Sequence, residues 1–495
     1  MKQIISIGLI VAFALTSCES YLDVNRNPNN PEAESLNPSL IFPGSEMALS
    51  SRYGNFLRIT GGYFSQHYAH QNGTSNYLDY SRWVMSATRS SATYTTLSTS
   101  ALKNLETIRE MAMEGEEWGS YLAATTLRAF IFQIFVDMYG EIPYKEAFLG
   151  LENLAPHYDD GETIYTGVLA EINEALGKVS ASSPVCTNFL FGTTTAGEWI
   201  QFANALKLKL LMRMSDVKEV RNELSALISD GNFPSNDVAW SDFWVNENGG
   251  ANPFYQEEFS ANFGSTQTNV VANLALVATM QASNDARLQA AFSPNSSGAY
   301  TGSVSGTNFS TWQGLSSGYW NRPRVVFNSP VFLISLAEIE FFLAEYYARY
   351  GGGDAAAHYQ AAVEASFATV GASGAGAVLE AYPWDAANYK RVIGIQKWVA
   401  LGCINPFEGW CEMRRLKYPA FGTVTGAQLY NETSAAYTPA LYQPGTLYMP
   451  IQNNAYLNAN TLLQRFQYPE SSTARNPNAP NFTNEDVNKR VFWVN

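Results

Sequence analysis

Apolar residues recur every three to four positions along most of the chain from about Leu40 onward. This spacing gathers them on one side of a helix and is typical of amphipathic helices. Four pairs of helical segments follow from it. The segments are 93–113 with 120–139, 160–179 with 196–214, 330–350 with 354–370, and 375–379 with 388–401. The pattern predicts an all-α fold, with strands only in short hairpins.

Residues typical of helix ends mark several of these boundaries. Thr195-Ala196-Gly197-Glu198 fits a capping box before the segment 196–214. Ser329 followed by Pro330 predicts the start of the third pair, and glycines at 351–353 end its first helix. The two helices around that turn resemble a tetratricopeptide pair, because small or aromatic residues stand at suitable spacing at Ala344, Ala356, Tyr359 and Ala362.

Four long stretches between the helices lack helical spacing and contain many Gly, Ser, Asn and aromatic residues. They are residues 232–266, 293–324, 418–448 and 468–484. Structureless segments of this length are uncommon in compact domains and usually carry function. We therefore expect a helical scaffold of tetratricopeptide-like pairs whose binding residues lie in long loops.

The chain begins like an exported protein. Lys2 precedes an apolar run from Ile4 to Leu15, which is too short to cross a bilayer, since crossing takes about 20 apolar residues. Leu15-Thr16-Ser17-Cys18 resembles the lipobox of bacterial lipoproteins, in which the cysteine receives the lipid. An ordinary secretory signal followed by a chance cysteine is the alternative.

The expected organisation has three parts. Residues 1–17 form the signal peptide, residues 18–43 form a tether rich in Asn and Pro that starts at lipidated Cys18, and residues 44–495 form one helical domain. Proline disfavours helix for itself and for the preceding residue, so the tether should be non-helical. No later segment is expected to have the length and apolarity of a transmembrane helix.

Charge and cysteine content narrow the possible partners. The chain has 30 Lys+Arg against 44 Asp+Glu, a formal net charge of -14, which repels nucleic acid and anionic lipid. Apart from Cys18 there are three cysteines, Cys186, Cys403 and Cys411, an odd number that does not predict a disulfide framework. Cys403 could pair with Cys411, but separate burial of the two thiols is favoured.

Side chains that could catalyse a reaction or hold a metal are sparse. His67 and His70 would share a helix face if residues 56–70 were helical, but no third ligand follows at metal-site spacing. Glu338, Glu340 and Glu345 are the carboxylates to check for a glycosidase pair, although solvated or helix-paired glutamates are favoured. We expect no cofactor, no metal and no catalytic residues.

Aromatic residues mixed with amides and charges occur in two loop stretches, residues 72–83 and 312–322. Sugar rings present C–H faces surrounded by hydroxyls, so a glycan site needs flat aromatic side chains and polar groups. Each aromatic residue taken singly also fits the core beneath a loop, since Trp and Tyr are mostly buried. The candidate ligand-binding residues are Asn76, Tyr77, Tyr80, Trp83, Trp312, Tyr319, Trp320 and Arg322.

Four short motifs occur in a fixed order along the chain. They are Asp23-Val24-Asn25-Arg26-Asn27-Pro28, the block 137–147 around Gly140-Glu141-Ile142-Pro143-Tyr144, the block 395–419 around Glu408-Gly409-Trp410, and Arg465-Phe466-Gln467-Tyr468-Pro469. Together they resemble the motifs of the SusD/RagB family of nutrient-binding outer-membrane lipoproteins. The Asn-Pro-Asn-Asn-Pro leader is similar to that of the second SusD-like subgroup.

The resemblance implies a non-catalytic protein on the outer membrane, facing the cell exterior. It would bind an oligosaccharide and pass it to a TonB-dependent SusC-like transporter. One alternative is a member of the same family that binds a peptide. The other is a helical glycoside hydrolase. The resemblance also implies structural roles for the motif residues: Trp398 and Trp410 would pack the last helices, and Arg414 and Arg415 would pair with acids.

Overall fold

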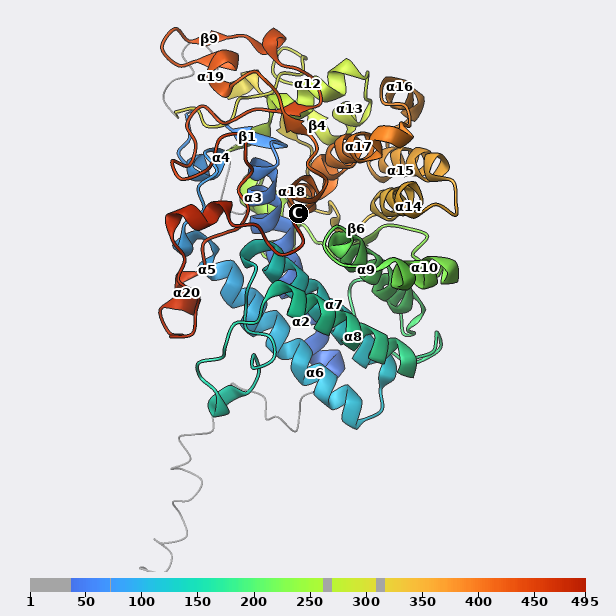
Figure 1. The fold of residues 1–495 in the computed structure, drawn as a ribbon. Helices are drawn as coiled ribbons and strands as arrows, with labels where there is room; N and C mark the ends of the chain where they lie inside the picture. Colours follow the sequence, from blue (N-terminus) through green and yellow to red (C-terminus); the bar gives the residue numbers. More distant parts are fainter. Residues whose placement is uncertain (1–36, 72, 261–268, 309–316) are drawn as a thin grey trace, which may run out of the picture.

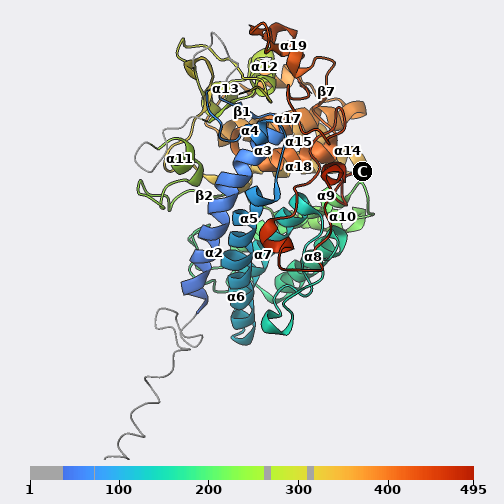
Figure 2. The ribbon, with the colours of Figure 1, turned by 90° about the vertical axis from the view of Figure 1, so that its left-hand side faces the viewer.

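The computed structural model describes residues 37–71, 73–260, 269–308 and 317–495. These residues form a predominantly helical body, so the all-α prediction is confirmed. One end of the body holds α2 (Pro38–Arg52), α6 (Lys103–Glu114), α7 (Trp118–Tyr139) and α8 (Gly161–Lys178). The other end holds α12 (Leu274–Ala282), α13 (Arg287–Ala291) and α19 (Gly426–Leu429), as Figures 1 and 2 show.

The first two predicted helix pairs are present and pack around α7. The chain runs through α5 (Ala87–Thr95) and the π-helix η3 (Thr96–Leu102) into α6, and returns as α7. α8 lies against α7, and α9 (Gly197–Met214) contacts both of them. α10 (Arg221–Asp230), which the apolar spacing did not predict, packs on α9.

The central helix α7 corrects one expectation from the sequence. By length and composition it could cross a membrane, although no segment after the signal peptide was expected to do so. Its apolar window is 100% buried inside the protein, as in the core helix of many folded domains. The helix is apolar on every side because α6, α8 and α9 surround it.

The third predicted pair is confirmed as α14 (Leu336–Tyr350) and α15 (Ala355–Thr369), but its start was wrong. Val331–Ile334 forms strand β6, and Ser335 caps α14 by accepting a hydrogen bond from the Glu338 N–H. The segment is extended because it pairs with strand β2 (Val238–Trp240), a partner that local spacing cannot reveal. Gly351, at φ 75°, ends the helix as predicted.

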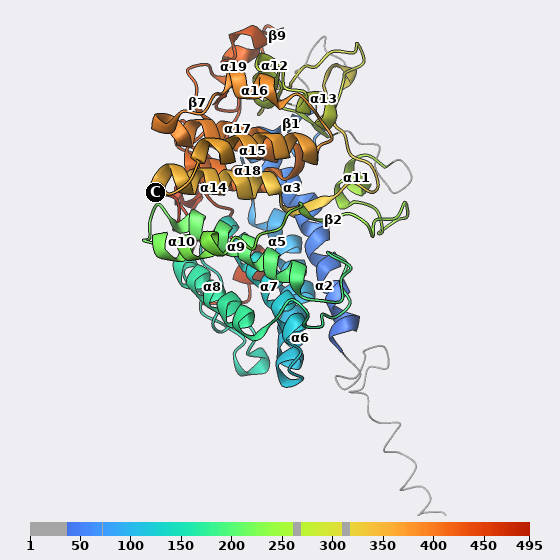
Figure 3. The same ribbon diagram turned by 90° about the vertical axis from the view of Figure 1, so that its right-hand side faces the viewer.

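The partner of the last predicted helix was also wrong. α17 (Tyr389–Ile404) packs mainly on α18 (Pro406–Leu416), whereas the short α16 (Ala375–Ala381) packs on α15. α18 was not predicted as a helix, because its charged side chains, among them Glu408, Glu412 and Arg415, are buried in ion pairs and do not form a solvent-facing side. Figure 3 shows α14, α15 and α17 stacked above α9 and α10.

Short strands tie distant loops together, and most are not the hairpins that were expected. β1 (Tyr68–His70) pairs with β3 (Val270–Ala272), and β4 (Phe292–Ser293) pairs with β5 (Arg322–Pro323). β7 (Ala420–Phe421) pairs in parallel with β10 (Thr446–Leu447). Among the described residues, the one local hairpin is β8 (Tyr430–Asn431) with β9 (Ala436–Tyr437).

Two predicted boundaries move by a few residues. Helix α2 begins at Pro38, so residues 38–43 belong to the helical body and not to an extended tether. Asn37 caps it, and Phe42 is buried edge-on against Trp199. The capping box at Thr195 is absent: α9 starts at Gly197 without a side-chain cap, and Thr195 forms a β-bridge with Pro184.

His67 and His70 do not share a helix face, because α3 (Arg58–Phe64) ends before them. His67 is fully buried and bonds the Ser65 hydroxyl, and burial lowers its pKa to about 3. A Cβ on Gly402 would lie 2.7 Å from the His67 ring, so two close-packed helices enclose this imidazole. No group of three or more metal-ligating side chains occurs in the ranges that the structure describes.

The helices meet at a buried ionic network, defined here by its carboxylates, Asp137, Glu338, Glu345, Glu408 and Glu412, and its cations, Lys209, Arg213, Lys397 and Arg415. These side chains come from α7, α9, α14, α17 and α18. All have side-chain exposures of 2% or less. Charges so fully desolvated are tolerated only when each is paired.

Arg213 of α9 stands at the centre of the network. It bonds Asp137 of α7 at 2.5 Å and also pairs with Glu408 and Glu412 of α18. Asp137 additionally accepts hydrogen bonds from the Tyr165 hydroxyl and the Trp493 indole. The motif blocks 137–147 and 408–419 therefore meet in space, which explains why they occur together.

The two arginines of the third motif, Arg414 and Arg415, differ in their contacts. Arg415 pairs with Glu345 and Glu412 as predicted. Arg414 instead donates to the backbone carbonyls of Gln464 and Asp137, and its guanidinium lies 3.5 Å from the Trp410 ring centroid. Trp398 and Trp410 are buried between the last helices, as predicted.

The glutamates considered for glycosidase chemistry are not solvated. Glu338 pairs with Lys209 at 2.8 Å, and Glu345 pairs with Arg415 at 2.6 Å, both inside the network. Glu340 lies 2.7 Å from the His358 ring of the neighbouring helix α15. Cys186, Cys403 and Cys411 are all free thiols, so the alternative of a Cys403–Cys411 disulfide is not realised.

Breaking the network should destabilise the protein strongly. Arg415→Met removes the partner shared by Glu345 and Glu412, and a buried charge left unpaired costs about 3–5 kcal/mol. Urea denaturation followed by circular dichroism measures this loss as a fall in the free energy of unfolding.

The control is Lys489→Met, which removes an exposed pair with Glu141 at 3.5 Å. Its free energy of unfolding should stay within about 1 kcal/mol of the wild type, because exposed pairs contribute little. If Arg415→Met lowers the free energy of unfolding by no more than this control does, removing Arg415 does not leave a costly unpaired charge in the network.

Candidate functional site

The two aromatic loop stretches converge on one short helix, α11 (Pro253–Glu258). Tyr77 precedes α4 (Leu78–Ser81) in the left-handed conformation, at φ 63°, and its hydroxyl donates to the Glu257 carboxylate at 3.3 Å. The Tyr77 ring stacks on Tyr80, with centroids 5.5 Å apart and planes at 11°. The first stretch therefore contacts the C-terminal end of α11 through Tyr77, and Tyr80 supports the Tyr77 ring.

The second stretch reaches the same end of α11 through Arg322. The guanidinium carbon lies 4.6 Å from the centroid of the Phe259 ring, and Nη2 donates to the Glu258 carbonyl at 3.2 Å. Tyr77 and Arg322 are thus held on neighbouring residues of one turn, although 245 positions separate them in the sequence. We call Tyr77, Tyr80, Glu258, Phe259 and Arg322 the loop junction.

A cavity of about 570 Å³ opens beside the loop junction. Its walls include Phe259, Trp320, Arg322 and Arg324, together with Ser293 of β4. The Nε of Arg322 is buried and has no hydrogen-bond partner in the described part of the chain. An unsatisfied donor next to an aromatic ring is suited to a ligand that offers both hydroxyl or carboxylate oxygens and an apolar face.

Glu258 adds a titratable group to the loop junction. It accepts hydrogen bonds from the backbone N–H and the side-chain amide of Asn269, at 3.1 and 3.2 Å. Burial raises its pKa from 4.5 to about 7, and the donors around it only partly oppose this shift. The protonation of the site therefore changes near neutral pH.

The structure separates the eight predicted ligand-binding residues into different environments. Asn76 is exposed, and Tyr77, Tyr319 and Arg322 are half-buried at or near the loop junction. Trp83 is fully buried and its indole donates to the Tyr63 carbonyl, so it belongs to the core. Tyr80 and Trp320 are 4% and 2% exposed. Trp312 lies outside the described residues.

The burial of Trp83 and Trp320 has one physical cause. Trp83 lies under the loop that follows α4, and Trp320 packs edge-on against Tyr437, with centroids 5.6 Å apart. Long loops need buried aromatic side chains beneath them, so the same residue types serve as core. Spacing in the sequence cannot separate an aromatic residue under a loop from one on its surface.

Glu258, Phe259 and Arg324 were not predicted as individual residues. All three lie in stretches that were expected to be functional loops, 232–266 and 293–324. None belongs to a motif, and their roles depend on contacts across the chain. The only sequence signal available was the length and composition of those loops.

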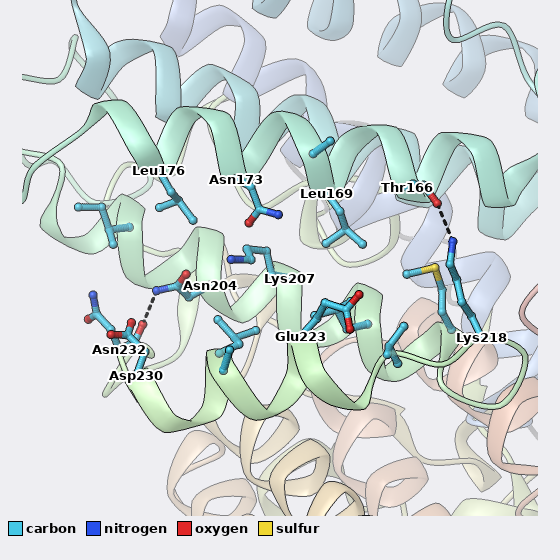
Figure 4. A pocket seen from close by; sticks show the side chains of 17 residues that line it. Thr166, Leu169, Asn173, Leu176, Asn204, Lys207, Lys218, Glu223, Asp230 and Asn232 are labelled. Atoms are coloured by element: carbon cyan, nitrogen blue, oxygen red, sulfur yellow. Dashed lines mark hydrogen bonds between the residues drawn. The ribbon is translucent and has the colours of Figure 1, made fainter.

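A second and larger cavity, of about 710 Å³, lies away from the loop junction, between α8, α9 and α10 (Figure 4). None of the predicted ligand-binding residues lines it, and neither does any aromatic side chain. Size alone would favour it as the site, but a glycan needs aromatic platforms. The loop junction is therefore the better candidate for sugar binding.

Comparison with known proteins gives matches over nearly the whole chain. The model of the SusD-like family described as "Starch-binding associating with outer membrane" matches residues 32–439. No curated protein matches the chain.

Several solved structures share the fold. A chitin-binding protein is 20% identical with a TM-score of 0.72, over 92% of this chain and 100% of that one. A SusD-like protein named Bacteroidetes AC2a is 19% identical with a TM-score of 0.71, over 93% of this chain and 100% of that one. A SusD homologue from Bacteroides uniformis is 19% identical with a TM-score of 0.69, over 94% of this chain and 100% of that one.

The raised pKa of Glu258 predicts a pH-dependent stability. Because the folded-state pKa, about 7, exceeds the ordinary 4.5, the contribution is present below pH 4.5 and is lost as pH rises through 7. Glu46, whose pKa burial also raises to about 7, acts in the same direction. The free energy of unfolding, measured with urea at pH 5 and pH 8, should therefore fall with rising pH.

Glu258→Gln should reduce this fall, by at most about 3 kcal/mol, since each pKa unit corresponds to about 1.4 kcal/mol. Glu247→Gln, at an exposed position outside the loop junction, is the control and should keep the wild-type fall. If the two variants show equal falls, Glu258 does not titrate as its burial implies.

Proposed function

Since the chain belongs to the SusD-like family described as starch-binding and associating with the outer membrane, we propose that it binds an oligosaccharide at the loop junction. It then delivers this ligand to a TonB-dependent SusC-like transporter. The protein is held on the outer membrane by lipid at Cys18 and faces the cell exterior. It performs no catalysis.

The observation that carries the sugar assignment is the meeting of Tyr77, Phe259 and Arg322 at one end of α11. Rings supply the apolar face that a sugar needs, and guanidinium and carboxylate groups bond its hydroxyls. The neighbouring cavity, of about 570 Å³, is large enough for a small number of sugar rings. Two proteins of similar fold are described as chitin-binding and as SusD-like, which is consistent with this proposal.

The arrangement of the body also supports the proposal. Helix α2 starts at one end of the molecule, where the tether from Cys18 joins it, and β4 at the cavity lies in the other half (Figure 1). An anchor at α2 would leave the loop junction away from the lipid surface. Glu338 and Glu345 are buried in ion pairs, so neither carboxylate reaches a sugar as a hydrolase would require.

Isothermal titration calorimetry against maltooligosaccharides and chitooligosaccharides tests the ligand class. We expect binding to at least one of these sugars, and about a tenfold weaker affinity for Arg322→Ala, because a hydrogen bond to a charged group contributes roughly 1.5–3 kcal/mol. Phe259→Ala should weaken binding similarly, through loss of the ring.

The matched control is Arg221→Ala on α10, whose guanidinium also stacks on an aromatic ring, Tyr350, at 5.5 Å but far from the loop junction. It should bind sugar like the wild type. If the protein binds no sugar in a wider glycan panel and peptides co-purify with it, the oligosaccharide proposal is wrong. The peptide alternative is then favoured.

The anchor is tested by Cys18→Ala. The wild-type protein should incorporate an alkyne-labelled fatty acid and sediment with membranes, whereas the variant should do neither, because two or more acyl chains are needed for stable anchoring. Cys186→Ala, which removes a buried thiol of the body, is the control and should stay lipidated. Release of intact wild-type protein into the soluble fraction would contradict the anchor.

A further inference from the structure

The cavity between α8, α9 and α10, which is larger than the one beside the loop junction, is a groove on the helical scaffold. α8 forms one wall, α9 the floor and α10 the other wall, and the volume is about 710 Å³ (Figure 4). This volume is typical of sites that bind small ligands or peptide side chains. The groove lies on a different part of the molecule from the loop junction and shares no lining residue with its cavity.

Each of the three helices contributes a leucine to the groove, and α9 also contributes one cation. Leu169, Leu211 and Leu227 are 8%, 5% and 7% exposed, so each offers a small apolar surface to the groove. Lys207 projects from α9 at the centre of the view in Figure 4. Burial lowers the pKa of Lys207, and the nearby Asp230 only partly opposes this.

The Lys207 ammonium has no hydrogen bond or salt bridge to any residue that the structure describes. The other lysine of the groove, Lys218, differs: it bonds Glu162 at 3.1 Å and the Thr166 hydroxyl at 3.2 Å. Asp230 is the nearby opposite charge, but it forms no salt bridge with Lys207, so the ammonium remains free to donate hydrogen bonds into the groove. An anion that reaches Lys207 would replace part of the solvation that burial removes.

Polar groups on the rim limit what that anion can be. Asn173 projects from α8 and Glu223 from α10 toward the same space (Figure 4), and both are exposed. Asp230 lies at one end, beside Asn204, whose amide donates to the Asn232 carbonyl at 3.0 Å. Carboxylates at the rim repel a polyanion but accept hydrogen bonds from N–H groups.

We propose that the groove between α8, α9 and α10 binds the C-terminal end of an extended peptide with aliphatic side chains, its free carboxylate on Lys207. Leu169, Leu211 and Leu227 contact the aliphatic side chains, and Asn173 and Glu223 bond the peptide backbone. The C-terminus of a partner protein has this chemistry. The site does not depend on the sugar-binding function of the loop junction.

Other ligands match the groove less well. A sugar would find no aromatic platform there. A nucleic acid is repelled by the net charge of -14. A fatty acid would use Lys207 and the leucines but would leave the rim amide and carboxylates without partners.

The test uses the full-length protein and a synthetic probe, acetyl-Ala-Leu-Ala-Leu, with either a free C-terminal carboxylate or a C-terminal amide. Calorimetry should give at least about tenfold tighter binding for the free acid, which corresponds to about 1.4 kcal/mol. Lys207→Gln should remove this preference, and Lys218→Gln, the matched lysine control, should retain it.

Asn173→Asp supplies a second variant that cannot disturb the core, because the side chain is exposed on α8. The added carboxylate should weaken binding of the free acid more than binding of the amide. The proposal is overturned if neither peptide binds, if both bind equally, or if Lys207→Gln keeps the preference. It is also overturned if octanoate binds as tightly as the free-acid peptide, since the rim would then play no part.

Discussion

The ion pairs of Arg213 with Asp137, Glu408 and Glu412 connect three helices that lie far apart in the sequence. Because a buried charge is costly without its partner, each of these helices is stable only in the arrangement that satisfies the others. Burial alone would raise the pKa of Glu412, but Arg415, Lys397 and Arg213 together hold it well below its ordinary value. The network thus selects one packing of α7, α9, α14, α17 and α18, where apolar contacts alone would allow several.

A scaffold fixed in this way can carry long loops, and the proposed sugar site lies on them. The loops are not held by a large sheet but by two-stranded pairings between remote segments, such as β1 with β3 and β4 with β5. Buried aromatic residues, among them Trp83 and Trp320, fill the space beneath them. The more accessible aromatic and charged side chains of the loop junction are therefore Tyr77, Phe259 and Arg322.

The two cavities differ in chemistry as well as in place. The one beside the loop junction combines aromatic rings with guanidinium groups, and the groove on the scaffold combines leucines with a single unpaired ammonium. The first matches the faces and hydroxyls of a sugar, whereas the second matches an aliphatic chain that ends in one carboxylate.

Local patterning determined the helices whose partners are close in sequence. The pairs α6–α7 and α14–α15 and the glycine end at Gly351 follow from apolar spacing and backbone freedom, which depend on neighbouring residues. The order of the motifs likewise indicated the family, and two of the motif blocks contribute Asp137, Glu408, Glu412 and Arg415 to the buried network. Tertiary structure alone decided that residues 331–334 are a strand and that Tyr77 and Arg322 meet at α11. In both cases the deciding contact joins segments far apart along the chain, and the spacing of residues within either segment does not predict it. α18 follows α17 directly, but its helix was not predictable from the sequence because its charges are buried in ion pairs with other helices.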